Sequence, residues 1–205
     1  MNGKIRFTLG KKVVLVVLAM SIILCATALF ISYQIYHGRV TAFYEEIGGN
    51  VARTLASQLD PGELDHYYET GEMDEAYYET QNFIADLVES SSVEYLYVVR
   101  PNGVGVTFLF DSDMEMGENG DYASGGYCAL GTYVELEGGF ADNLDRLLAG
   151  ENVEPIVQQD PSYGWLMTAM TPVLHENGAM AGYVMADISM NDVMQEQRNF
   201  LLYTG

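Results

Sequence analysis

The sequence predicts an α+β fold in which a long N-terminal helix precedes an antiparallel sheet of about five strands flanked by helices. Helix signals come first: Asp60 and Asp74 each stand where an N-cap residue belongs, ahead of apolar residues at helical spacing. Strand signals come later, as apolar runs around the turn dipeptides Asn102-Gly103 and Asn177-Gly178. Helices followed by hairpins, rather than alternating with strands, favour an antiparallel arrangement.

An apolar run at 13–33 contains no charged residue. As a helix it would rise about 31 Å at about 1.5 Å per residue, enough to cross a hydrocarbon core of about 30 Å. A cleaved signal peptide is the alternative, and Ala26-Thr27-Ala28 is similar to a cleavage site. The apolar part of such peptides is only about 7–15 residues long, so we predict a transmembrane helix at 13–35.

Charge is distributed unevenly along the 205 residues, which carry a formal net charge of −20. Four of the nine basic residues lie at 1–12, and the first acidic residue is Glu45. Basic residues before a membrane helix favour the cytoplasm, so we predict a cytoplasmic N-terminus at 1–12, a cell-membrane location and an extracytoplasmic main domain. The acidity of that domain argues against nucleic acid and anionic lipid surfaces as partners.

Residues 36–60 continue as a predicted stalk helix. Apolar residues recur there at helical spacing, at Val40, Phe43, Ile47, Val51, Leu55 and Leu59. Gly48-Gly49 weakens the middle by about 1 kcal/mol per glycine relative to alanine, which favours a bend. The stripe can pack on its own domain or on a second copy of the chain, and its period does not distinguish the two.

Residues 61–188 are predicted to form the extracytoplasmic domain. Strands are expected at 93–100, 104–111, 153–158 and twice within 164–189, and a short helix at 140–148. A glycine-rich acidic segment at 112–131 is expected to form a long loop over one face. A capping box from Ser189 predicts an exit helix at 189–205, leading toward a second membrane segment beyond the residues given.

The hairpin at 164–189 is the clearest local signal. A two-residue loop at Asn177-Gly178 would pair Thr168 with Asp187, and a four-residue loop would shift that pairing by two. Either register gives one face that combines apolar residues with a hydroxyl, a phenol and a carboxylate: Thr168, Ala181, Tyr183 and Asp187. Such a face is typical of a pocket wall.

Catalytic and metal-binding motifs are absent from the sequence, which has no Gly-x-Ser-x-Gly, Cys-x-x-Cys, His-Glu-x-x-His or phosphate-binding glycine loop. The segment from Asp111 is similar to a calcium loop, but its glycine comes one place late and its twelfth residue is Tyr122. His175 is interpreted as a solvated turn residue. Cys25 lies in the membrane run, so Cys128 has no disulfide partner within the chain, and we interpret it as a small buried or half-buried residue, with an intermolecular bridge as the alternative. We predict no catalysis, no metal and no cofactor for these residues.

Aromatic walls with a few convergent polar groups characterise small-molecule pockets. The candidates of that kind are Tyr95, Tyr97, Arg100, Asp111, Trp165, Thr168, Tyr183 and Asp187. Arg100 can hold a carboxylate through two hydrogen bonds, and Asp187 or Asp111 can meet an ammonium group. The alternative is that the aromatic residues are core packing and that the charged residues end strands in solvent.

Four characteristic segments follow the basic N-terminus, the predicted membrane helix and the long helix. The first is 59–77, which begins Leu-Asp-Pro-Gly-Glu-Leu, and the second is Glu-Tyr-Leu-Tyr-Val-Val-Arg-Pro-Asn-Gly at 94–103. The third is Tyr-Gly-Trp at 163–165, and the fourth is Gly-Tyr-Val-Met-Ala-Asp-Ile-Ser-Met at 182–190. In this order of parts the chain resembles the single-Cache (PAS-like) extracytoplasmic sensors of bacterial transmembrane receptors. The resemblance spans nearly the whole chain through short segments. It implies a long N-terminal helix, a mixed sheet, and an amino acid, carboxylate or similar metabolite held on the membrane-distal side of that sheet. No complete amino-acid-binding signature is present.

The chain is therefore expected to be the small-molecule sensing module of a membrane-bound signalling receptor, forming a homodimer. Similar sensors precede diguanylate cyclase, chemoreceptor, histidine kinase or phosphatase modules, and we expect such an output module to be missing from these residues. The alternative is a membrane-anchored interaction or structural domain with no small-molecule ligand.

Overall fold

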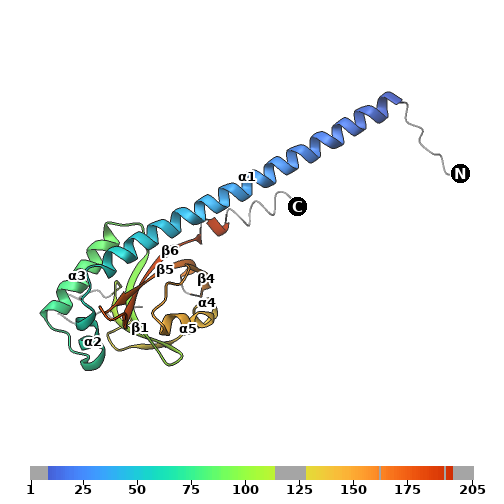
Figure 1. Cartoon of the computed structure of the whole chain (residues 1–205). Coiled ribbons are helices and arrows are strands. Elements are labelled where there is room, and N and C mark those ends of the chain that lie inside the picture. Colours follow the sequence, from blue (N-terminus) through green and yellow to red (C-terminus); the bar gives the residue numbers. More distant parts are fainter. Residues whose placement is uncertain (1–8, 114–127, 162, 192, 196–205) are drawn as a thin grey trace. The chain divides into compact units, whose positions relative to one another are not determined.

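Two units make up the chain, Met1–Ala42 and Phe43–Gly205. The computed structural model describes residues 9–113, 128–161, 163–191 and 193–195 (Figure 1). The helix α1, Leu9–Ala56, is 48 residues long and contributes to both units. In the first unit its large apolar side chains are exposed, and by length and composition alone it could cross a membrane. The predicted membrane and stalk helices are thus one uninterrupted helix.

The last turns of α1 pack within the second unit. Ile47 and Leu55 of the predicted stripe contact the domain core. Gly48 faces the sheet, where a Cβ would stand 3.0 Å from the Cβ of Ala169 and 3.2 Å from Cδ1 of Ile188. The glycine therefore lets the helix approach the sheet closely, and the helix continues through it.

Two capped helices follow, α2 (Pro61–Thr70) and α3 (Glu75–Glu89). The carboxylate of Asp60 accepts hydrogen bonds from two backbone N–H groups of α2, and that of Asp74 accepts one from α3. Short polar side chains at this position satisfy N–H groups that have no partner within the helix. Both predicted helix starts are confirmed.

Within the described residues the sheet has six antiparallel strands in the order β3-β2-β1-β6-β5-β4. The strands are β1 (Tyr95–Asn102), β2 (Gly105–Asp111), β3 (Tyr133–Glu135), β4 (Ile156–Asp160), β5 (Gly164–Leu174) and β6 (Met180–Ser189). The prediction of about five strands is corrected to six, and α+β is confirmed. The additional strand is β3, an edge strand of three residues paired with β2. Three residues are too few to show the alternation by which strands are recognised in a sequence.

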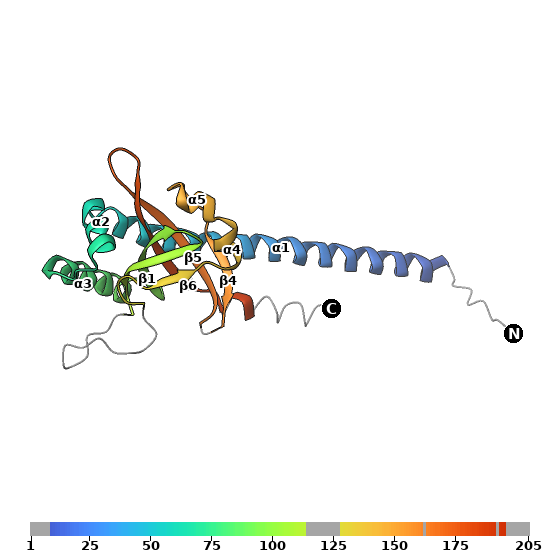
Figure 2. The same ribbon diagram turned by 90° about the horizontal axis from the view of Figure 1, so that it is seen from below.

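The β5–β6 hairpin pairs Thr168 with Asp187, the register predicted for a two-residue loop. Its loop is nevertheless longer, because the N–H of His175 donates to the carbonyl of Ala179 across three residues. A register shift between Val173 and Leu174 compensates for the extra loop residue. Figure 2 shows these two long strands ending in a turn near α2.

Two local predictions are wrong in detail. Ala181 falls at the register shift, and its side chain joins the core on the opposite face from Tyr183. The helix predicted at 140–148 is two short helices, α4 (Gly138–Asp142) and α5 (Leu144–Leu148), separated at Asn143. The predicted 112–131 loop and 189–205 exit helix lie largely outside the described residues, although 191 and 193–195 are helical.

Helices cover both faces of the sheet (Figure 1). One core lies between the sheet and the last turns of α1 with α2 and α3. A second, smaller core lies between the sheet and α4, α5 and the segment before β4. We refer to these as the α2–α3 face and the α4–α5 face.

Candidate functional site

A cavity of about 200 Å³ lies on the α4–α5 face, at the end of the sheet where β1 and β5 begin and where β2, β4 and β6 end. Its lining is aromatic and acidic: Tyr95, Tyr97, Phe108, Asp111, Asp113, Cys128, Asp160, Tyr163, Leu166 and Asp187. The volume is below the roughly 300–1,000 Å³ of sites for drug-sized ligands. The cavity therefore suits a compact molecule.

Asp187 is the most buried carboxyl group of the cavity, with 7% of the residue exposed. Thr168, directly opposite on β5, donates a hydrogen bond from Oγ1 to Oδ1 of Asp187 at 2.5 Å. The phenol of Tyr97 on β1 donates to the same oxygen at 3.3 Å. Among the described residues Oδ2 of Asp187 accepts no hydrogen bond. One oxygen of this carboxyl group is therefore available to a ligand.

Burial raises the pKa of Asp187 from 3.8 to about 7. The hydrogen bonds from Thr168 and Tyr97 oppose this rise because they favour the charged form, while the carboxylates of Asp160 and Asp111 add to it. Burial and the neighbouring Asp187 hold the pKa of Tyr97 well above its ordinary value, so the phenol remains a donor. The protonation of Asp187 consequently changes near neutral pH.

Asp111 reaches the cavity because of a bulge in β2. Val98 pairs with Phe110 and Val99 pairs with Phe108, which leaves Leu109 as an extra residue. Leu109 and Phe110 both contribute to the core on the α2–α3 face. After this extra residue the alternation is reversed, and Asp111 lies on the cavity side with Phe108.

Both carboxylate oxygens of Asp111 are already occupied by the backbone. Oδ1 accepts the N–H of Asp113 at 3.1 Å and Oδ2 accepts the N–H of Cys128 at 2.7 Å. Burial raises the pKa of Asp111, and these two bonds oppose the rise. Asp111 thus holds together the two chain segments that leave β2 and return toward β3.

Two aromatic pairs stand beside the carboxylates. The rings of Tyr95 and Tyr163 are tilted with centroids 4.8 Å apart, and those of Tyr97 and Phe108 stack at 5.5 Å. Asp160, at the end of β4, accepts the backbone N–H of Tyr163 at 3.0 Å. The cavity therefore presents phenol rings and carboxylates together.

Asn191 connects this wall to the chain that leaves β6. Its side chain accepts the N–H of Trp165 at 2.8 Å and donates to the carbonyl of Tyr163 at 3.2 Å and to Ser189 Oγ at 3.1 Å. Gly164, between the two bonded peptides, has φ 83°, and a Cβ there would overlap the Asn191 amide. The cavity residue Tyr163 is therefore held directly by the exit segment.

The structure brings together Tyr95, Tyr97, Asp111 and Asp187 of the predicted candidates, with Thr168 bonded to Asp187 behind the lining. Trp165 does not line the cavity. Tyr183 is on the same face, but its phenol donates to the carbonyl of Glu151 at 2.8 Å within the smaller core, and burial raises its pKa to about 12.

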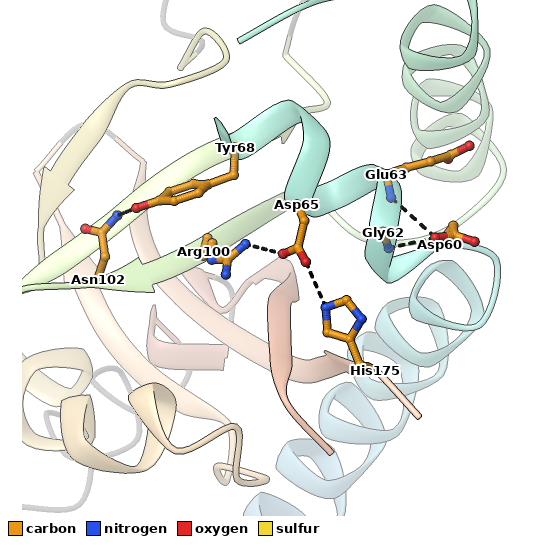
Figure 3. Close-up of polar contacts among 8 residues, drawn as sticks. All are labelled: Asp60, Gly62, Glu63, Asp65, Tyr68, Arg100, Asn102 and His175. Carbon is orange, nitrogen blue, oxygen red and sulfur yellow. Dashed lines mark hydrogen bonds and ion pairs between the residues drawn. The ribbon is translucent and has the colours of Figure 1, made fainter. Parts of the chain in front are cut away.

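Arg100 does not line the cavity. Its side chain has a partner within the protein (Figure 3). Its guanidinium donates to Asp65 of α2 and stands 4.5 Å from the ring centroid of Tyr68. His175, interpreted as a solvated turn residue, lies with Nε2 3.0 Å from the other oxygen of Asp65. This cluster joins α2 to β1 and to the end of the β5–β6 hairpin.

Six lining residues were not among the sequence candidates: Phe108, Asp113, Cys128, Asp160, Tyr163 and Leu166. Tyr163 belongs to the Tyr-Gly-Trp segment of the resemblance, so a signal for it existed. Asp113 belongs to the calcium-like segment, and within the described residues no group of three or more His, Cys, Asp or Glu side chains is arranged to hold a metal ion. Asp160 joins the site only through the pairing of β4 with β5.

Comparison with known proteins adds no family assignment: no protein-family model matches the sequence, and a search of curated proteins finds no match.

Proposed function

We propose that this chain is the extracytoplasmic small-molecule sensing module of a membrane-bound bacterial signalling receptor of the single-Cache (PAS-like) kind. The observation that carries the proposal is the cavity beside Asp187, where one oxygen of this buried residue's carboxyl group accepts no hydrogen bond from the described residues and aromatic side chains line the same cavity. Buried polar groups in proteins are normally hydrogen-bonded, so an unused oxygen in a cavity is well suited to a ligand.

The position of the cavity supports a signalling role. Asp187 is two residues before the end of β6, and Tyr163 is bonded to Asn191 on the segment that follows. A ligand that displaces Tyr163 acts on the exit segment through this hydrogen bond, and a ligand that displaces Asp187 acts on it along the chain. Signalling requires that the ligand bind two states of this contact with different affinity.

In the receptor that we propose, the N-terminus of α1 lies in the cytoplasm and the domain lies outside the cell membrane. A membrane span at 13–35 places basic residues on one side and the acidic domain on the other. We propose that the receptor is a homodimer and that its output module lies outside this sequence. Mass measurement of the full chain in detergent by light scattering tests the dimer, and a monomeric mass would contradict it.

A thermal-shift screen of the full chain in detergent, against a panel of amino acids, amines, carboxylates and other small metabolites, tests the sensing function. At least one compound is expected to raise the unfolding temperature, because a ligand that binds only the folded state stabilises it. Asp187→Asn should abolish this response. Asp86→Asn is the matched control, since it makes the same change of charge at an exposed residue of α3.

The alternative function is a membrane-anchored interaction or structural domain without a small-molecule ligand. It would be favoured if no compound shifted the unfolding temperature of the wild-type chain. A compound whose effect survived Asp187→Asn would instead place binding elsewhere on the domain.

A further inference from the structure

We propose that the cavity beside Asp187 binds a small organic cation and holds its ammonium group on Oδ2 of Asp187. This inference rests on the proposed sensing function and names the ligand class of that same site. It departs from the expectation that Arg100 receives a carboxylate, because Arg100 is bonded to Asp65 and does not line the cavity.

The charges around the cavity are all of one sign. Four carboxyl groups line it, those of Asp111, Asp113, Asp160 and Asp187, and no basic side chain does among the described residues. The sequence agrees, since it has no Lys, Arg or His between Arg100 and Arg146 or between Arg146 and His175. A carboxylate ligand would therefore be repelled, while a cation would be attracted.

Of the two most buried carboxyl groups in the cavity lining, those of Asp187 and Asp111, the carboxyl group of Asp187 is the one with capacity for a ligand. Asp111 is equally buried, at 8% exposed, but both of its oxygens accept backbone N–H groups. Among the described residues, Asp187 accepts hydrogen bonds on Oδ1 alone, from the hydroxyl groups of Thr168 and Tyr97. An ammonium donor on Oδ2 would complete the hydrogen bonding of Asp187 and also neutralise its buried charge.

The aromatic lining favours an organic cation over a metal ion. Phenol rings attract an ammonium group through their electron-rich faces, and two aromatic pairs flank the carboxylates, Tyr95 with Tyr163 and Tyr97 with Phe108. A metal ion needs several oxygen ligands at short range, and the described residues contain no such group of three or more acidic, His or Cys side chains.

Four probes that share a four-carbon chain and differ in charge test the proposal: butylamine, butan-1-ol, butanoate and 4-aminobutanoate. Binding to the full chain in non-ionic detergent is measured by ligand-observed NMR titration near pH 8. Butylamine is expected to bind about tenfold or more tightly than butan-1-ol, the change that one hydrogen bond to a charged group produces. Butanoate and 4-aminobutanoate should bind more weakly than butylamine, because their carboxylates meet the acidic lining.

Asp187→Asn should reduce butylamine binding to the level of butan-1-ol while leaving butan-1-ol itself unchanged. Asp86→Asn, on the exposed side of α3, should leave all four titrations unchanged. This pair separates a contact at Asp187 from a general effect of net charge.

Equal binding of butylamine and butan-1-ol would overturn the cation proposal, and so would tighter binding of either carboxylate-bearing probe. A neutral or anionic metabolite whose thermal shift requires Asp187 would leave the sensing function standing and overturn the ligand class alone. No response to the metabolite panel together with no binding of butylamine would overturn both.

Discussion

The carboxyl group of Asp187 is buried and is hydrogen-bonded by residues of the neighbouring strands. Thr168 across the strand pair and Tyr97 on β1 bond the same oxygen, while Asp111 and Asp160 add negative charge nearby. Burial is the largest cause of its raised pKa. Asp187 therefore makes the domain sensitive to pH, because the charge of its carboxyl group changes near neutral pH.

The stability of the domain should therefore fall as Asp187 ionises. Its pKa is raised from 3.8 to about 7 on folding, so the folded state binds more protons than the unfolded state between these values, and the unfolding free energy decreases with rising pH. The contribution of Asp187 is present in full below pH 3.8, the ordinary pKa of the group, and is lost as pH rises to about 7. Its slope is at most about 1.4 kcal/mol per pH unit.

Denaturant unfolding of the wild-type chain and of Asp187→Asn, at intervals between about pH 4.5 and about pH 7.5, measures this effect. The stability of the wild type relative to the variant should decrease across that range. Tyr97, Asp111 and Asp160 face position 187 in both proteins, so the effect of their own titration on the difference largely cancels. A difference that does not vary with pH would contradict the shift.

The Arg100 cluster should contribute to stability and leave ligand binding unaffected. Asp65→Asn removes the charge that joins Arg100 to His175, and the side chains of Arg100 and Asp65 are 24% and 34% exposed. For a pair this accessible the expected loss is only about 1 kcal/mol. Denaturant unfolding measures the loss, and butylamine titration of the same variant should match the wild type. Weaker butylamine binding in this variant would extend the site to α2.

At the element scale, two irregular features decide what the regular strands present. The extra residue Leu109 in β2 turns Asp111 toward the cavity, although a regular strand would place it with Leu109 on the opposite face. The left-handed Gly164 starts β5 and leaves room for Asn191. Both are irregularities of the strand backbone that position side chains of the site.

Gly164→Ala should destabilise the domain more than Gly178→Ala. Both glycines have positive φ, 83° and 84°, so both substitutions incur backbone strain of about 1–2 kcal/mol. A Cβ at Gly178 meets no atom within 4 Å, whereas one at Gly164 overlaps the amide of Asn191. The excess loss at Gly164 therefore reports the Asn191 contact.

Denaturant unfolding of both single variants, and of Gly164→Ala combined with Asn191→Ala, measures that contact. The combined variant should lose less than the sum of its two single changes, because removing the amide relieves the overlap. Strict additivity, or equal losses at Gly164 and Gly178, would contradict the proposed link between the cavity wall and the exit segment.

At the scale of the whole molecule, the chain combines an apolar helix with an acidic domain that has its own hydrophobic core. Residues 1–42 and 43–205 form separate units, and the exposed apolar side chains at 13–33 would be unfavourable in water. Among the described residues one helix could span a membrane, by length and composition. The orientation of that span is a prediction from the basic residues at 1–12.

Cysteine labelling in intact cells tests this orientation. With Cys25 and Cys128 replaced by serine, a cysteine at exposed Glu89 should react with a membrane-impermeant thiol reagent. A cysteine at Lys12 should react only after permeabilisation, because that residue is predicted to be cytoplasmic. Labelling of position 12 alone in intact cells would reverse the orientation, and labelling of neither position would place the domain inside.

Several features of the fold follow from the sequence because their causes are local. Asp60 and Asp74 cap helices through their own side chains, and the shared face of Thr168 and Asp187 results from period-two alternation around a turn. The apolar run at 13–33 is likewise a property of consecutive residues. Four candidates for the site could be identified because aromatic and acidic residues at strand ends are visible in the sequence.

Tertiary structure alone decided which candidates meet. Arg100 is on the opposite face of β1 from Tyr97 and is neutralised by Asp65, a partner 35 residues away in sequence that no local pattern indicates. Asp160 reaches the cavity through the pairing of β4 with β5, and Asp111 through the extra residue in β2. The physical reason is that a side chain's face and charge partner depend on strand register and on contacts between distant segments, which a local pattern does not contain.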